Sequence, residues 1–540
     1  DQSSAASDVY KRQIKNIILM KNKINLLIAS LVLVVFSFSD VNAQKSRKMK
    51  KADQAFELEL YSEAIKQYKK AYKKTKDKSL KAENIFKQAE CYRLSGKILQ
   101  ASIYYERAVF MNYHDAIAIF NYAEVLRMLG KYDEARDQYV NYIQKTLAEE
   151  KMSKEEILKL ASDDARHVNY IKGELGLRSC DFALKWKDLP TRYRVKSMPL
   201  LNSRFNDFSP TYGDADYSKL YFVSSREGEL TSKIDGRTGE YFSDIWFTTY
   251  NKEREMWLKP SLAQPPINTE GNEGPIHLNS RGTVMYITQC KFEKKKILGC
   301  GIYVSERSGR DWKESQLLQL KVDSNTVGHP TLNKDESIII FSADLPNGYG
   351  GKDLWISRKG KRNTWSDPQN LGDLINTKGD ELFPFILEDN DGKMTIYFAS
   401  NGHIGMGGLD IFKTTENEIG AFTSPVNLKS PINSPGDDFA MIVESDQERG
   451  YLTSNRDGGF GGDDIYQFEL VALNLSLQGI VTDAKTGSIM TDIPVKLVAS
   501  NGTTASIKTD NTGKYSFPLD PLTSYEIIVN TEGYIKSTIK

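Results

Sequence analysis

The chain is poor in the residues that most often carry chemistry. Its 540 residues include only four cysteines and five histidines. Four cysteines are too few for a fold that is built on disulfide bonds. The sequence also lacks a Ser-His-Asp arrangement, a phosphate-binding loop and a CxxC motif. We therefore expect a protein that is not an enzyme and that uses no catalytic residue, cofactor or metal ion.

An excess of charge of one sign is missing as well. The chain has 72 Lys and Arg residues against 71 Asp and Glu residues, which leaves a formal net charge of +1. Proteins that bind nucleic acid carry a clear basic excess. Nucleic acid is therefore not an expected partner.

Long apolar runs are absent except for one, from Ile24 to Phe38. It follows a short basic segment and precedes a small-residue site that ends at Ala43. This order is typical of a secretory signal peptide, and the run is too short for a membrane span. We predict a signal peptide over residues 20–43, cleavage between Ala43 and Gln44, and export to the periplasm. A retained N-terminal anchor is the alternative.

Residues 1–19 have a different origin in our interpretation. The string DVYKRQ, from Asp8 to Gln13, is the translation of a common transposase sequencing adapter. We interpret this segment as read-through ahead of a natural start at Met20.

Small residues and tyrosines recur with a fixed spacing between residues 44 and 175. Two copies of the pattern are 34 residues apart, from Ala89 to Ala123. The pattern resembles the tetratricopeptide repeat, whose paired helices approach closely at small residues. We predict three helical hairpins and a polar capping helix from Ser153 to about Lys172. The pattern comprises Ala52, Ala64, Tyr68, Ala89, Ala101, Tyr105, Ala123, Ala135 and Tyr139.

The first part of this helical region is basic. Residues 44 to 90 carry fourteen Lys and Arg residues against seven Asp and Glu residues. A solvated helical face explains the excess; the alternative is a basic face that docks an acidic protein or a membrane surface. The groove of the repeats is expected to bind a peptide or a helix.

Between residues 181 and 470 the pattern changes to short strands, and one phrase recurs five times. Its clearest copy runs from Ile375 to Phe412 and ends in GMGGLDIF. Four short strands and a glycine-rich turn in about 55 residues are typical of a propeller blade. We predict a β-propeller of five blades, with six as the alternative. The aligned positions are Pro210, Pro275, Pro330, Pro384 and Ala440.

The first and the last copies of the phrase complement each other. The segment from Arg192 to Ser203 precedes the first copy, whereas the last copy ends at DDIYQFEL without a fourth strand. We therefore expect the first segment to complete the last blade, which would remove open sheet edges. The aspartates of the GGxD phrases are expected to cap the glycine-rich turns.

Few side chains in the strand region are candidates for chemistry. His277 and His329 lie near inner strands of neighbouring blades and could face the channel, whereas His403 lies in a loop. The run Asp389-Asn390-Asp391-Gly392 resembles a calcium loop but lacks its further ligands, so a hairpin turn is the better interpretation.

The cysteines divide into two pairs. Cys290 and Cys300 flank a nine-residue loop between two predicted strands. They could close that loop as a disulfide bond or remain free. Cys91 is expected in a helix and Cys180 in the linker that follows the helical region, either buried as free thiols or paired.

Residues 473–540 predict a small β-sandwich. Its strands alternate with turn phrases, and the motif GIVTDAKTG…TDNTGKYSF spans Gly479 to Phe517. This motif resembles the carboxypeptidase-regulatory-like domain. The sequence stops within the expected fold, so we interpret the sandwich as truncated.

The order of these regions resembles a family of periplasmic envelope proteins from bacteria with type IX secretion and gliding motility. In that family an outer membrane protein A-like, peptidoglycan-binding domain comes last, and nothing in this sequence matches it. The resemblance covers residues 44–540 and implies a non-enzymatic scaffold associated with the outer membrane. Envelope proteins would bind the repeat groove and a propeller face, and peptidoglycan only the missing domain. The alternatives are a propeller that binds or cleaves glycan and a soluble TolB-like accessory to envelope transport.

Overall fold

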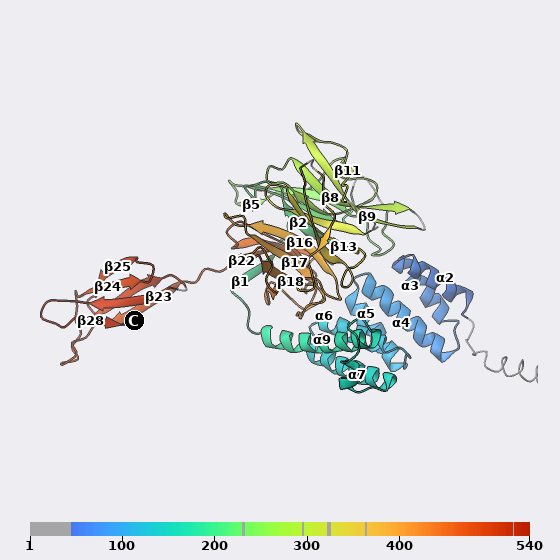
Figure 1. Ribbon diagram of the computed structural model, residues 1–540, viewed down its shortest axis with the longest axis horizontal. Coiled ribbons are helices and arrows are strands. Elements are labelled where there is room, and N and C mark those ends of the chain that lie inside the picture. Colours follow the sequence, from blue (N-terminus) through green and yellow to red (C-terminus); the bar gives the residue numbers. More distant parts are fainter. Residues whose placement is uncertain are drawn as a thin grey trace, which may run out of the picture.

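The computed structural model describes residues 45–228, 233–293, 296–320, 326–361, 364–521 and 523–539. A helical region comes first, a larger β region follows, and a small β unit lies apart at the end (Figure 1). No helix within these ranges combines the length and the apolarity needed to cross a bilayer. The expected adapter segment and the signal peptide with its Ala43–Gln44 junction lie outside the described residues.

The helical region consists of three hairpins and closing helices. Successive helices pack against each other, and the last long helix packs on the third hairpin. The pairs are α2 (Arg47–Glu57) with α3 (Tyr61–Tyr72), α4 (Lys78–Leu94) with α5 (Ile98–Phe110), and α6 (Ile117–Met128) with α7 (Tyr132–Glu150), followed by α8 (Lys154–Ile157) and α9 (Ala165–Trp186).

The recurring alanines and tyrosines form the core of this stack. All nine of them are completely buried. Each tyrosine hydroxyl donates a hydrogen bond to a carboxylate on the first helix of its own hairpin, as Tyr68 does to Asp53 at 2.7 Å. Burial of the hydroxyl is therefore compensated. The small residues let the backbones approach, and the tyrosines fill the space between layers.

The closing helix differs from the predicted one. Ser153 caps only the short α8, and α9 starts behind Asp164 and continues to Trp186, beyond the expected end near residue 175. The helix continues because its last turns have apolar partners: Phe182 and Trp186 pack into a cluster with Met406 of the β region. Cys180 consequently lies in this helix and not in a linker.

Five antiparallel sheets of the described β region form a ring. Their innermost strands, β2, β7, β12, β16 and β20, neighbour one another in a closed cycle. From the inside outward the sheets are β2 (Asp207–Tyr212), β3 (Lys219–Ser224), β4 (Asp244–Asn251) and β5 (Met256–Trp257) with β6 (Ser261–Leu262); β7 (Asn272–Leu278), β8 (Val284–Glu293), β9 (Lys296–Ser308) and β10 (Asp311–Trp312) with β11 (Gln316–Leu317); β12 (Val327–Leu332), β13 (Ile338–Ala343), β14 (Asp353–Arg358) and β15 (Gln369–Asn370); β16 (Glu381–Glu388), β17 (Met394–Ser400), β18 (Asp410–Thr415) and β19 (Val426–Asn427); and β20 (Asp438–Val443), β21 (Arg449–Ser454), β22 (Asp464–Leu470) and β1 (Tyr193–Ser197).

The fifth sheet is completed by a strand from the start of the ring. β1 pairs antiparallel with β22, with Tyr193 opposite Leu470 and Ser197 opposite Tyr466. The chain then continues from β1 to the first sheet. Asn202 fixes this connection to the fifth sheet, because its side chain bonds both the N–H and the C=O of Ile465. The predicted role of the segment from Arg192 to Ser203 is confirmed.

The C-terminal unit is a small two-sheet arrangement. Its core contains Val495, Leu497, Phe517 and Ile527. One sheet pairs β23 (Leu475–Ile480) with β26 (Lys514–Leu519); the other comprises β25 (Thr504–Lys508), β24 (Pro494–Ala499), β27 (Tyr525–Val529) and β28 (Ser537–Ile539).

Candidate functional site at the axis of the ring

Each innermost strand carries a β-bulge at the recurring proline phrase. The pairing register shifts there in all five strands. Four bulges contain a non-glycine residue with left-handed backbone: Ser209 (φ 50°), His329 (φ 54°), Phe383 (φ 51°) and Ala440 (φ 49°). Ala440 therefore takes the place before the proline, and Met441 takes the place of the proline itself. This corrects the predicted alignment by one residue.

The bulges are stabilised by bonds between neighbouring sheets. The N–H of Ser209 donates to Thr453 Oγ1 at 2.9 Å, and the N–H of His329 donates to Thr288 Oγ1 at 2.9 Å. A bulge bends its strand and redirects side chains. Here the five bulges together line a small cavity of about 40 Å³ on the axis.

Aromatic side chains close the axis. The ring of His329 stacks on Phe383 with 4.0 Å between centroids, and Phe383 packs on Phe439 at 4.6 Å. His329 Nδ1 also accepts a hydrogen bond from the N–H of Phe383 at 3.2 Å. His329 is therefore a neutral ring held in a fixed tautomer, with its proton on Nε2.

Both histidines that the sequence placed near the channel line this axial cavity. Burial lowers the pKa of His277 to about 4 and, with a smaller contribution from the charge of Lys352, that of His329 to about 3. Both are neutral at physiological pH. His403 lies in a turn, where its Nε2 is 2.8 Å from the carbonyl oxygen of Ile375.

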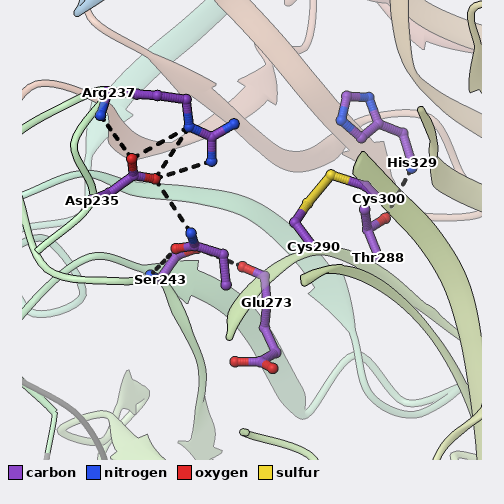
Figure 2. The surroundings of a disulfide bond; sticks show 9 residues. Asp235, Arg237, Ser243, Glu273, Thr288, Cys290, Cys300 and His329 are labelled. Carbon is purple, nitrogen blue, oxygen red and sulfur yellow. Dashed lines mark hydrogen bonds and ion pairs between the residues drawn. A yellow bond between two sulfur atoms is a disulfide. The ribbon is translucent and has the colours of Figure 1, made fainter. Parts of the chain in front are cut away.

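A larger cavity of about 250 Å³ adjoins the small axial cavity, with which it shares Pro275 and His329, and extends over the starts of the first three inner strands. Asp235 and Arg237 form an ion pair at 3.0 Å on one side of it. Cys290, Cys300 and His329 lie on the other side, and Glu273 lies between them (Figure 2). We name this space the axial pocket. Its lining also includes Asn206, Ser225, Ser243, Asn272, Thr288 and Lys352.

Glu273 is the most perturbed acid of the axial pocket. Its Oε1 accepts hydrogen bonds from the N–H and the hydroxyl of Thr269, at 3.2 and 2.6 Å. Its Oε2 has no partner among the described residues, nor does either carboxylate oxygen of the neighbouring Asp244. Burial raises the pKa of Glu273 to about 7 and that of Asp244 to about 6. Glu273 can therefore exchange a proton near neutral pH.

The acids that occupy the position of Glu273 in the innermost strands of the first and fifth sheets have a different environment from Glu273. Asp207 is paired with Arg226, and Asp438 is paired with Arg456 at 2.5 Å. Glu381 of the fourth sheet shares the environment of Glu273: it accepts bonds from Thr377 and Ser400, and burial raises its pKa to about 7. The titratable groups are thus distributed around the ring.

Stability should fall as pH rises through neutrality. The raised pKa of Glu273 means that the folded protein holds a proton that the unfolded chain releases near its ordinary pKa of 4.5. This contribution to stability is complete below pH 4.5 and is lost as pH rises through about 7. The parent protein should lose free energy of unfolding between pH 6.5 and 8.5, and Glu273→Gln should lose about 1 kcal/mol less over the same interval. Chemical denaturation at both pH values measures this difference.

The control for this measurement is Glu270→Gln, three residues away on an exposed segment and bonded to Lys233. Its lowered pKa puts its titration well below the tested window. It should leave the pH dependence of unfolding unchanged. Equal pH dependence in Glu273→Gln and the parent protein would contradict the buried, protonated Glu273.

The repeated aspartates of the GGxD phrases serve the turns, as predicted. Asp353 accepts a bond from the N–H of Tyr349 at 2.7 Å, and Asp410 and Asp464 accept bonds from two turn amides each. The asparagine of the recurring phrase also bonds backbone groups: Asn376 bonds the N–H and the C=O of Leu354 at 2.8 and 3.0 Å. Asp389 also caps a hairpin turn, through the N–H groups of Asp391 and Lys393.

The described residues contain no group of three or more His, Cys, Asp or Glu side chains that could hold a metal ion. Cys290 and Cys300 are joined by a disulfide bond. They lie directly opposite each other within the paired strands β8 and β9, not at the ends of a nine-residue loop, because both strands continue beyond them. Cys91 and Cys180 are buried free thiols, and burial raises the pKa of each to about 12.

The helical region is seated on the ring through the tight turns inside its hairpins. The N–H of Ser62 donates to the carbonyl oxygen of Gly236 at 3.3 Å, and Lys97 Nζ donates to that of Thr238 at 3.4 Å. In the third hairpin Arg127 donates to the carbonyl oxygen of Gly407. The stack therefore contacts the first sheet and the turn that precedes β18.

Arg127 is the centre of this junction. Its guanidinium binds Glu124 at 2.8 Å and Tyr139 at 3.3 Å in addition to Gly407, and only 5 % of its side chain is exposed. Gly407 has no room for a side chain, since a Cβ would lie 2.1 Å from the carbonyl oxygen of Gly436. The glycine-rich phrase of the fourth sheet thus provides a backbone surface for the arginine.

The bulges, the axial pocket and the junction were not predicted. Prolines recurring inside strands were the available signal for the bulges, because proline in a strand marks a bulge or an edge. For the junction the signal was a Glu-x-x-Arg pair that occurs in two hairpins, as Glu90 with Arg93 and Glu124 with Arg127. The arginine of this pair contacts the ring in the third hairpin, at Arg127, and only the tertiary arrangement shows that role.

Comparison with known proteins identifies one part of the chain. Residues 476–540 match the carboxypeptidase regulatory-like domain, as the sequence motif predicted. No curated protein matches the chain.

Several solved structures are similar at low identity. An endo-arabinase from Bacteroides thetaiotaomicron is 13 % identical with a TM-score of 0.34, over 52 % of this chain and 98 % of that chain. An alpha-L-arabinofuranosidase from Lactobacillus brevis is 14 % identical with a TM-score of 0.33, over 54 % and 95 %. A putative TolB from Agrobacterium tumefaciens is 11 % identical with a TM-score of 0.31, over 62 % and 97 %. These values do not assign an activity.

Proposed function

We propose that this protein is a non-enzymatic scaffold that is exported to the periplasm and associated with the outer membrane. It binds partner proteins in envelope assembly, type IX secretion or gliding. Its hairpins act as tetratricopeptide repeats, and its ring acts as a five-bladed propeller related to WD-type and TolB-type repeats.

The observation that carries the proposal is the buried junction at Arg127. A fully buried arginine fixed by three partners holds the helical stack on the ring. Two surfaces, the groove of the hairpins and an open face of the ring, are thereby presented in one fixed geometry. A scaffold needs such an arrangement, because partners bound to separate surfaces must be held at a constant distance.

The distribution of titratable groups supports the same function. Catalytic sites concentrate perturbed acids and bases in one pocket. Here the two inner-strand acids with a pKa raised to about 7, Glu273 and Glu381, lie in different sheets of the ring. His329, which shares the axial pocket with Glu273, is a neutral ring whose Nδ1 is bonded to the N–H of Phe383.

The proposal is tested by recovery of partners from cross-linked envelopes. Deletion of residues 45–186 should abolish association, because it removes the repeat groove and the junction. His277→Ala and His329→Ala should each leave both association and envelope phenotype nearly unchanged in variants that retain the circular dichroism of the parent. If either histidine substitution alone abolished function in a folded protein, the proposed scaffold function would be wrong.

The second candidate is a ring that binds or cleaves glycans. The observation in its favour is Glu273, a carboxyl group with a pKa raised to about 7 in a cavity of about 250 Å³. Release of reducing ends from envelope glycans, abolished by Glu273→Gln, would establish this function in place of the first.

A further inference from the structure

The edge of the helical stack that faces away from the ring can be identified from the junction. The turns inside the hairpins contact the ring at Ser62, Lys97 and Arg127. Because consecutive helices run antiparallel, the connections between hairpins lie at the opposite edge. That edge contains the last turns of α3 and α5 and the connections that follow them. We name it the distal edge.

The distal edge is strongly basic. Residues 69–81 contain seven lysines and a single acid, Asp77. The carboxylate of Asp77 caps α4 by accepting a bond from the N–H of Leu80 at 2.8 Å. Six of the lysines are exposed and form no ion pair with any described residue: Lys69, Lys70, Lys73, Lys74, Lys76 and Lys78. Their charges are therefore available to a partner.

An exposed phenylalanine lies beside these lysines. Phe110 is the last residue of α5, and 87 % of it is exposed. Arg107, one turn earlier, lies 5.8 Å from the ring of Tyr72 at the end of α3, so the ends of the two helices are adjacent. Leu99 and Ile103 extend the apolar stripe along α5, with 60 % and 49 % exposed. Lysines near the C-terminus of a helix interact favourably with the helix dipole, but that role does not explain why Phe110 is exposed.

We propose that the distal edge docks on an anionic phospholipid surface. Phe110 would enter the boundary between headgroups and acyl chains, while the lysines would lie at the lipid phosphates. A basic cluster and an inserted apolar side chain are each weak membrane signals that together give stable binding. An acidic protein would need carboxylates matched to fixed positions, whereas these lysines are unpaired on flexible stems. The fluid headgroup layer fits such a surface better.

The experiment is sedimentation of the purified protein with vesicles. We expect binding to vesicles of phosphatidylethanolamine and phosphatidylglycerol, and little binding to vesicles of phosphatidylcholine alone. Replacing Lys70, Lys73, Lys74 and Lys76 by glutamate should weaken binding by at least about 30-fold. Phe110→Ser should weaken it by about 10-fold, with the circular dichroism of the parent retained in both variants.

A charge-matched control separates the distal edge from net charge. Four exposed lysines elsewhere are replaced by glutamate: Lys259, Lys361, Lys378 and Lys485. This variant should keep most of the binding. The proposal is overturned if the parent protein does not bind anionic vesicles, or if both four-lysine variants lose binding equally. The scaffold function is unaffected by these outcomes, since the assay contains no protein partner.

Discussion

Replacing Arg127 by alanine is expected to release the helical region from the ring. The substitution leaves Glu124, the Tyr139 hydroxyl and the Gly407 carbonyl without their shared donor. Removal of one partner from a buried charged network costs about 3–5 kcal/mol. We expect calorimetry to resolve separate transitions for the two regions, and limited proteolysis to cut between residues 187 and 192 in the variant alone.

The second hairpin supplies a matched control. Arg93 binds Glu90 at 2.8 Å and Tyr105 at 3.0 Å, as Arg127 binds Glu124 and Tyr139, but it forms no hydrogen bond or ion pair with the described residues of the ring. Arg93→Ala should therefore destabilise the helical stack without separating it from the ring. If Arg93→Ala and Arg127→Ala gave the same proteolysis pattern, Arg127 could not be the residue that joins the two regions.

Proline at position 196 is expected to open the ring. The N–H of Met198 donates to the carbonyl oxygen of Ile465 at 3.1 Å. Antiparallel pairs alternate along the strand, so the N–H of Lys196 also faces β22. Lys196→Pro removes that donor and should cost at least about 2 kcal/mol. The freed edge of β22 should also promote aggregation.

Lys196→Ala is the control, because it removes the same exposed side chain and retains the N–H. Denaturant unfolding should place Lys196→Ala close to the parent protein and Lys196→Pro well below it, and light scattering should detect association of the proline variant alone. Equal stability of the two variants would show that β1 does not hold the ring closed.

Local features of this protein were determined by the sequence itself. The alanines and tyrosines around Tyr68, Tyr105 and Tyr139 specify hairpins, because close helix packing depends on residues at fixed short spacings. Asp353 and Asn376 specify turns, because their side chains bond backbone groups only a few residues or one strand away. Even the long-range pairing of β1 with β22 followed from the sequence, since one copy of the phrase lacked a strand and another had one to spare.

Only the tertiary structure decided the rest. Arg127 meets Gly407 across 280 positions of the chain. The Glu-x-x-Arg pair at Arg127 also occurs at Arg93, so the local sequence does not show which arginine makes such a contact. The end of α9 at Trp186 depends on a cluster with Met406, and the pKa of Glu273 depends on burial between sheets. Hydrogen bonds and helix packing within a repeat are encoded by nearby residues. Desolvation and contacts between regions arise only when distant segments exclude water together, so they were fixed by the assembled molecule.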